Sequence, residues 1–151
     1  MKLRTGDASM PAPLSGRELC AATSGLSVNL PVADMQASLA FQRDVLGVKV
    51  VYSDADFAAL AGFGAQWCLH ADHTYTDHPL HSIARAQDGR GAGAEIRLYG
   101  CDPDAAQAAA QRLEHVVLAG AMDKPDGLRE VYLLDCDGYC WVPSVPCVPQ
   151  D

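Results

Sequence analysis

The sequence predicts an α+β fold of two tandem βαβββ modules, which form a cupped mixed β-sheet around a central cavity with the helices on the outside. The same order of strand and helix patterns occurs twice, each helix pattern follows an Asp cap, and an Asp-Gly turn joins the last two strands. One helix and four strands cannot cover both faces of their own sheet, so two such modules are expected to pair. The predicted domain covers residues 24–147, with modules at about 24–85 and 93–147, and follows a flexible N-terminal arm at residues 1–23.

The first half opens with a strand pattern at residues 26–32, where apolar and polar residues alternate. Asp34 then caps a helix at residues 35–46, and Gly47 ends it. Three further strand patterns complete the half, at residues 48–52, 56–62 and 66–71. The polar connection at 72–92 exceeds usual loop lengths, so it is interpreted as a functional lid or a mobile segment.

The second half repeats this order. A strand pattern at residues 93–99 precedes Asp102 and Pro103, which open an alanine-rich helix that runs to about residue 115. Three strand patterns follow, at residues 116–121, 129–134 and 139–142. The turn from Asp135 to Gly138 joins the last two, with the Asp side chain bonding to its own backbone and the Gly adopting positive φ.

Composition excludes several classes of function. The formal net charge of −8 and the absence of a basic run disfavour nucleic acid and anionic membranes as partners. No apolar run is long enough to span a bilayer, and the N-terminal residues lack the apolar core of a secretory signal. The six cysteines at irregular spacings are therefore expected to be reduced thiols in a cytoplasmic protein.

Two motifs resemble the vicinal oxygen chelate superfamily, which contains glyoxalase I, bleomycin-resistance proteins, fosfomycin-resistance enzymes and extradiol dioxygenases. The first motif has Val-Ala-Asp at residues 32–34, Ser and Phe at 38 and 41, and Leu-Gly at 46–47. The second is the hairpin with Asp-Cys-Asp-Gly at residues 135–138, where the superfamily usually has Pro in place of Cys136. The resemblance covers about residues 24–146 and implies the paired-module fold.

The resemblance also places the superfamily's metal ligands. The usual His of the first strand falls on Ser27, the His of the second half's first strand on Glu95, and the final Glu on Val142. A further Glu of glyoxalases falls near Cys68. Because Ser is a poor donor and Val is none, we expect no metal at this position. The alternative is a displaced zinc, nickel or manganese site that uses His70 and Glu95.

Strand parity predicts a polar cavity face that binds a small molecule. Its expected members are Ser27, Asn29, Cys68, His70, Glu95, Arg97, Glu130 and Tyr132. Asn29 and Arg97 would bind ligand oxygens, and Tyr132 would stack or donate a hydrogen bond. The competing interpretation is that Glu95, Arg97 and Glu130 lie on a solvated sheet surface.

A histidine-rich stretch follows the fourth strand. Histidines 70, 73, 78 and 81 occur within twelve residues, which allows a metal site, a general base at His70, or loop histidines that cap turns. Their spacing matches no defined zinc motif, so turn capping is favoured for all but His70.

Three functions remain open. The first is a small-molecule-binding protein of the bleomycin-resistance type, metal-free and homodimeric by analogy, whose acidic surface would suit a cationic ligand. The second is a glyoxalase-like lyase or isomerase that uses acid–base catalysis by His70 or Glu130, or a displaced metal at His70 and Glu95. The third, a structural module with an unused pocket, is least favoured because the predicted cavity face is polar.

Overall fold

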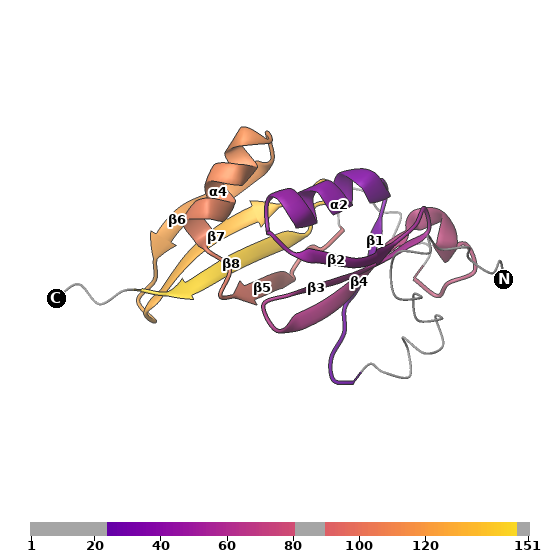
Figure 1. Ribbon diagram of the computed structural model, residues 1–151, viewed down its shortest axis with the longest axis horizontal. Helices are drawn as coiled ribbons and strands as arrows, with labels where there is room; N and C mark the ends of the chain where they lie inside the picture. Colours follow the sequence, from indigo (N-terminus) through magenta and orange to yellow (C-terminus); the bar gives the residue numbers. More distant parts are fainter. Residues whose placement is uncertain (1–23, 81–89, 148–151) are drawn as a thin grey trace, which may run out of the picture.

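The computed structural model, which describes residues 24–80 and 90–147, has two four-stranded sheets, each accompanied by a helix (Figure 1). The elements of the first half are β1 (Asn29–Val32), α2 (Met35–Asp44), β2 (Lys49–Ser53), β3 (Phe57–Gly62), β4 (Ala65–Ala71) and the 3₁₀ turn η1 (Asp72–Tyr75). Those of the second half are β5 (Glu95–Tyr99), α4 (Pro103–Arg112), β6 (Val116–Asp123), β7 (Leu128–Leu134) and β8 (Cys140–Pro146). The predicted tandem βαβββ order and the α+β class are confirmed.

The two sheets have the same topology. The strand orders are β1-β4-β3-β2 and β5-β8-β7-β6, with the first strand of each half parallel to the fourth and the remaining neighbours antiparallel. A parallel pair needs a crossover connection, and the helix of each half begins that crossover. The first and second halves are therefore structural repeats, as the sequence predicts.

Both helices begin where the sequence predicts, because a carboxylate accepts from the free amides of the first turn. Asp34 Oδ1 accepts from the amides of residues 36 and 37, and Asp102 Oδ1 from those of residues 104 and 105. The helices end at Asp44 and Arg112, earlier than the predicted residues 46 and 115, and the chain turns left-handed just beyond them at Gly47 (φ 69°) and Glu114 (φ 59°). Neither helix has the length and apolar character that crossing a bilayer requires.

The first strand is shorter than predicted. β1 begins at Asn29, and only a bond from the Cys68 amide to the Val28 carbonyl (2.9 Å) precedes its ladder with β4. Ser27 therefore lies outside the strand and is exposed, not on the sheet face where the sequence places it. The alternation of apolar and polar residues extends back to residue 26, but the backbone of residues 26–28 is not part of the ladder between β1 and β4.

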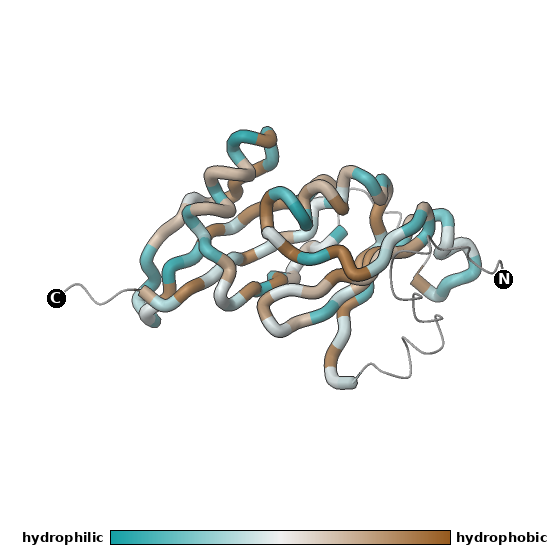
Figure 2. The backbone as a smooth tube through the Cα atoms, viewed as in Figure 1, coloured by the Kyte–Doolittle hydropathy of each residue, from teal (hydrophilic) through white to brown (hydrophobic). Residues whose placement is uncertain are grey.

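One hydrophobic core joins the two halves. The rings of Trp67 on β4 and Trp141 on β8 lie 5.5 Å apart between centroids, and Phe41 on α2 meets His115 edge-on at 4.9 Å. Figure 2 shows that hydrophobic and hydrophilic residues are interspersed along the strands, in keeping with sheets that have one buried face. The core lies on the helix-facing sides of the sheets, so the opposite sides are available for other roles.

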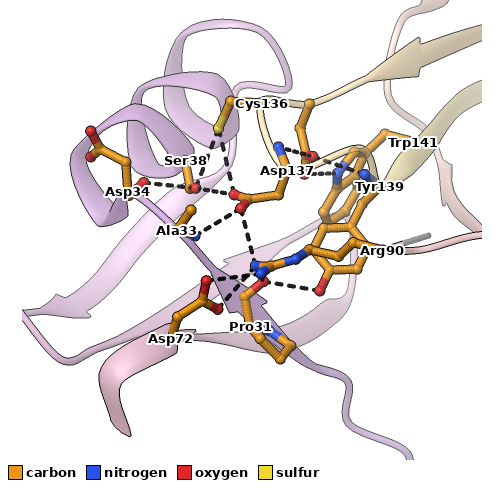
Figure 3. Close-up of polar contacts among 11 residues, drawn as sticks. Pro31, Ala33, Asp34, Ser38, Asp72, Arg90, Cys136, Asp137, Tyr139 and Trp141 are labelled. Carbon is orange, nitrogen blue, oxygen red and sulfur yellow. Dashed lines mark hydrogen bonds and ion pairs between the residues drawn. The ribbon is translucent and has the colours of Figure 1, made fainter. Parts of the chain in front are cut away.

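The turn between β7 and β8 packs against the start of α2 (Figure 3). Asp137 accepts from the Ala33 amide (2.8 Å) and the Ser38 hydroxyl (2.8 Å), and it pairs with Arg90 (3.2 Å). Arg90 also holds Asp72 (2.8 Å), and the side chains of Arg90 and Asp137 are only 5% and 3% exposed. We call Asp72, Arg90 and Asp137 the Arg90 clamp. It ties the last hairpin of the second half to the first half.

Candidate functional site

The face of the second sheet that α4 does not cover, here called the open face, carries a connected polar group. Alternation puts Trp141 and Leu133 in the core and leaves Arg97, Val142 and Glu130 on the open face of β5, β8 and β7. The sequence-based prediction placed Glu95, Arg97, Glu130 and Tyr132 on one face, and they do share this one. The register explains why these side chains can meet.

Arg97 is the centre of this group. Its guanidinium donates to Glu130 Oε1, to Glu95 Oε2 (3.1 Å) and to the Tyr99 hydroxyl (3.2 Å). Tyr132 donates its hydroxyl to the second oxygen of Glu130 at 3.1 Å. We call these five residues the Arg97 network. Burial lowers the pKa of Arg97, but the hydrogen bonds to Tyr99 and Glu95 raise it overall, so the charge persists.

Val142 makes this network possible. It lies on β8 directly between Arg97 and the strand that carries Glu130, and it is fully buried. Strands lie about 4.8 Å apart, so Arg97 must reach over β8 to a carboxylate two strands away. A short apolar side chain leaves room for that reach. The position where the superfamily resemblance expects a metal-binding Glu thus supports an ion pair in this chain.

Glu130 is the most deeply buried charged side chain of the open face. It is 1% exposed, whereas Arg97 is 28% and Glu95 49% exposed. A buried carboxylate is tolerated only when it is paired and hydrogen-bonded, and Arg97 and Tyr132 supply both. Glu95 and Tyr99 remain in contact with solvent, so the network has a buried base and an accessible rim.

Two tyrosine rings of the open face each have a cation above them. The Arg97 guanidinium lies 5.7 Å from the Tyr99 ring centroid, and the Lys124 ammonium lies 5.5 Å from that of Tyr132. Sequence reasoning missed Tyr99, although it shares the parity of Glu95 and Arg97. It also missed Lys124, which belongs to the turn after β6 and carries no periodic signal.

A cavity of about 670 Å³ adjoins the Arg97 network. Its walls are Gly91, Ala92, Gly93, Ala94, Glu95, Arg97, Leu134, Gly138 and Cys140. Gly91 has φ 72°, and a β-carbon there would lie 2.7 Å from the Tyr139 ring, so only glycine fits. Burial raises the pKa of Cys140, and Glu95 raises it further, so the thiol in this wall stays protonated at neutral pH.

Of the remaining predicted site residues, Asn29, Cys68 and His70 belong to the first sheet, and Ser27 precedes it. Asn29 pairs with Cys68 in the ladder, and His70 packs edge-on against the rings of Phe57 (5.0 Å) and Tyr75 (5.6 Å). Burial, then the charge of His78, lowers the pKa of His70, so its imidazole is neutral at pH 7. No hydrogen bond or ion pair among the described residues links His70 to Glu95 or Glu130.

The other histidines of this segment have local partners. His73 pairs with Asp56 at 2.8 Å, and the His78 ring accepts from the Leu80 amide at 3.1 Å. His81 lies outside the described residues. Within residues 24–80 and 90–147, no three His, Cys, Asp or Glu side chains converge as a metal site would require.

Comparisons with known proteins address the fold. The sequence matches no protein-family model, and the search of curated proteins found no match. A glyoxalase/bleomycin resistance protein/dioxygenase family enzyme from Burkholderia phytofirmans aligns at a TM-score of 0.67, with 15% identity over 80% of this chain and 96% of that one. A glyoxalase-related enzyme from Fulvimarina pelagi aligns at 0.64, with 16% identity over 82% and 88%. A lactoylglutathione lyase from Agrobacterium tumefaciens aligns at 0.60, with 20% identity over 82% and 93%.

These likenesses show the fold. The chain has the architecture of glyoxalase/bleomycin-resistance/dioxygenase proteins, so the predicted vicinal oxygen chelate fold is confirmed. A shared fold carries many chemistries, so the function must be argued from the site.

Proposed function

We propose that this protein binds a small organic cation on the open face of the second sheet, without a divalent metal and as a homodimer. The observation that carries this proposal is the Arg97 network, in which two carboxylates, one guanidinium and two tyrosines leave one net negative charge beside a cavity. The net charge of −8 supports attraction of a cation at long range. The accessible Glu95 and the ring of Tyr99 are the groups that a ligand would meet first.

The homodimer has its own support. The core joins the helix-facing sides of both halves, so a second copy can approach the open face. Val116, Leu118 and Met122 on the edge strand β6 are 55%, 61% and 38% exposed, which supports a covering partner. The five described cysteines are free thiols and support a reducing, cytoplasmic location.

Ligand binding is tested with a thermal-shift panel of cationic aromatic compounds and their neutral analogues. Cationic members are expected to raise the melting temperature of the wild-type protein, and Glu95→Gln is expected to weaken that effect about three- to tenfold in ligand concentration, because one carboxylate charge is lost at the rim. Glu114→Gln, an equal charge change on an exposed loop, is the matched control. A panel in which no compound shifts the wild-type protein would contradict the proposal.

The metal-free mode is tested separately by elemental analysis of the purified protein. We expect far less than one equivalent of zinc, nickel or manganese, and no change in melting temperature with a chelator, because Val142 offers no donor and Arg97 would repel a divalent cation. A stoichiometric metal that disappears in His70→Ala would instead establish the displaced site at His70 and Glu95.

A second candidate function is a metal-free lyase or isomerase. The observation in its favour is that Glu130 is buried, hydrogen-bonded to Tyr132 and adjacent to the accessible part of the network. Such a carboxylate can move a proton if a ligand displaces Arg97 from it. Conversion of a bound thiol-adduct substrate, abolished by Glu130→Gln, would establish this activity in place of simple binding.

A further inference from the structure

Lys124 holds an unusual position for a lysine. Its ammonium lies over the Tyr132 ring, the residue is half-buried, and it makes no ion pair with a described side chain. Its backbone is fixed by bonds from the Lys124 amide to the Leu128 carbonyl (2.7 Å) and from the Gly127 amide to the Lys124 carbonyl (3.0 Å). The main chain is therefore held while the long side chain can rotate away without disturbing the turn.

The Tyr132 ring, which lies beneath the Lys124 ammonium, is electron-rich and therefore attracts a cation. Tyr132 donates its hydroxyl to the buried carboxylate of Glu130, and this bond shifts electron density toward the phenol ring. Arg97 already neutralises Glu130, whereas Glu95 adds a negative charge nearby. A cation over this ring gains from the π-electrons and from the nearby carboxylates.

A lysine ammonium is not the cation that such a ring favours most. A primary ammonium is strongly hydrated, and the free-energy cost of removing this water offsets much of its attraction to the ring. A quaternary ammonium has no N–H groups and is weakly hydrated, so aromatic faces recognise it well. It can therefore displace Lys124, which regains its water when it swings out.

We propose that Lys124 is a resident cation that occupies the Tyr132 face in the free protein and makes the site selective for ligands that carry a quaternary or heavily alkylated ammonium. This inference rests on the proposed binding function and adds the chemical class of the ligand and the residue that selects it. Neutral ligands and primary amines gain too little from the ring to replace Lys124.

The test titrates the full chain with choline and with its neutral isostere 3,3-dimethyl-1-butanol by calorimetry. Lys124→Ala is expected to bind choline about two- to fivefold more tightly than the wild type, because no resident cation has to leave. The neutral isostere is expected to gain by a similar factor, because it too no longer has to displace the lysine, whereas relief of charge repulsion alone would strengthen the binding of choline only. Lys49→Ala, the same charge change on β2 of the other sheet, is expected to leave both affinities unchanged.

A double-mutant cycle separates the ring from simple charge repulsion. If the gain in choline affinity acts through Tyr132, Lys124→Ala does not raise choline affinity in a protein that also carries Tyr132→Leu. A gain in affinity that persists in this background overturns the inference. In the wild type, NMR signals of the Lys124 side-chain methylenes are expected to be shifted upfield by the ring and to return when choline binds. Methylene signals without an upfield shift would contradict the position of Lys124 over the ring. This test uses the wild-type protein alone.

The outcomes distinguish this inference from the binding function itself. Choline affinity that is equal in the wild type and in Lys124→Ala, with other compounds of the panel still bound through Glu95, overturns the role of Lys124 and leaves the binding function intact. Failure of every variant and of the wild type to bind any compound overturns both.

Discussion

Replacing Arg90 with alanine is expected to lower the free energy of unfolding by about 3–5 kcal/mol, the usual cost of removing one partner from a buried ion pair. Arg90 is 5% exposed, and its loss leaves Asp137, 3% exposed, without its cation. The side chain also donates to the Pro31 carbonyl (2.7 Å), which loses that donor. Urea denaturation, followed by tryptophan fluorescence from the core, measures the change.

Two further variants are compared with Arg90→Ala. Arg90→Lys keeps the charge but cannot form the forked pair with Asp72, so its stability is expected to lie between wild type and Arg90→Ala. Arg43→Ala removes the exposed pair with Asp44 and is expected to change little, because solvent screens such pairs. Equal stability of Arg90→Ala and Arg43→Ala would mean that the clamp does not hold the halves together.

Replacing Arg97 with methionine is expected to cost about 3 kcal/mol of stability, near the low end for a buried pair because Arg97 is 28% exposed. The buried Glu130 carboxylate then keeps only the hydrogen bond from Tyr132. Binding of cationic ligands is expected to be altered as well, because Glu95 loses the guanidinium that positions it. Denaturation and calorimetry on the same samples measure the two effects.

The double variant Arg97→Met with Glu130→Leu separates stability from function. Replacing both members of a buried pair by apolar side chains is often neutral, so stability is expected to return toward the wild-type value. Ligand binding is not expected to return, since the charges of the network are gone. A double variant that is as unstable as Arg97→Met alone would show that packing around Val142, and not the unpaired carboxylate, causes the loss.

The fold could be predicted because its signals are local. Asp34 and Asp102 cap the helices that they were expected to cap. The Asp135 carboxylate accepts from the amides of Asp137 and Tyr139, as predicted for this turn, and Gly138 has φ 89°. The start of β1 was misplaced because alternation reports which side chains could face a core, whereas a strand also needs a paired backbone. Ser27 was therefore assigned to a sheet that does not include it.

The site was only partly predictable. Parity correctly grouped Glu95, Arg97 and Glu130, since a strand's period fixes the face of each side chain. That Arg97 crosses β8 depends on strand order and on the size of Val142, which only the assembled sheet brings together. Arg90 gave no local signal at all, because its partners lie 18 and 47 residues away in sequence.

The bonds from Asp137 have a consequence for the order in which the chain can fold during synthesis. Asp137 meets the Ala33 amide across 104 residues and the Ser38 hydroxyl across 99. A ribosome that adds about 5–20 residues per second releases the first half seconds before the hairpin that completes it. The nascent first half therefore waits, with α2 lacking its last partners and Trp67 its neighbour Trp141, until the hairpin has been synthesised.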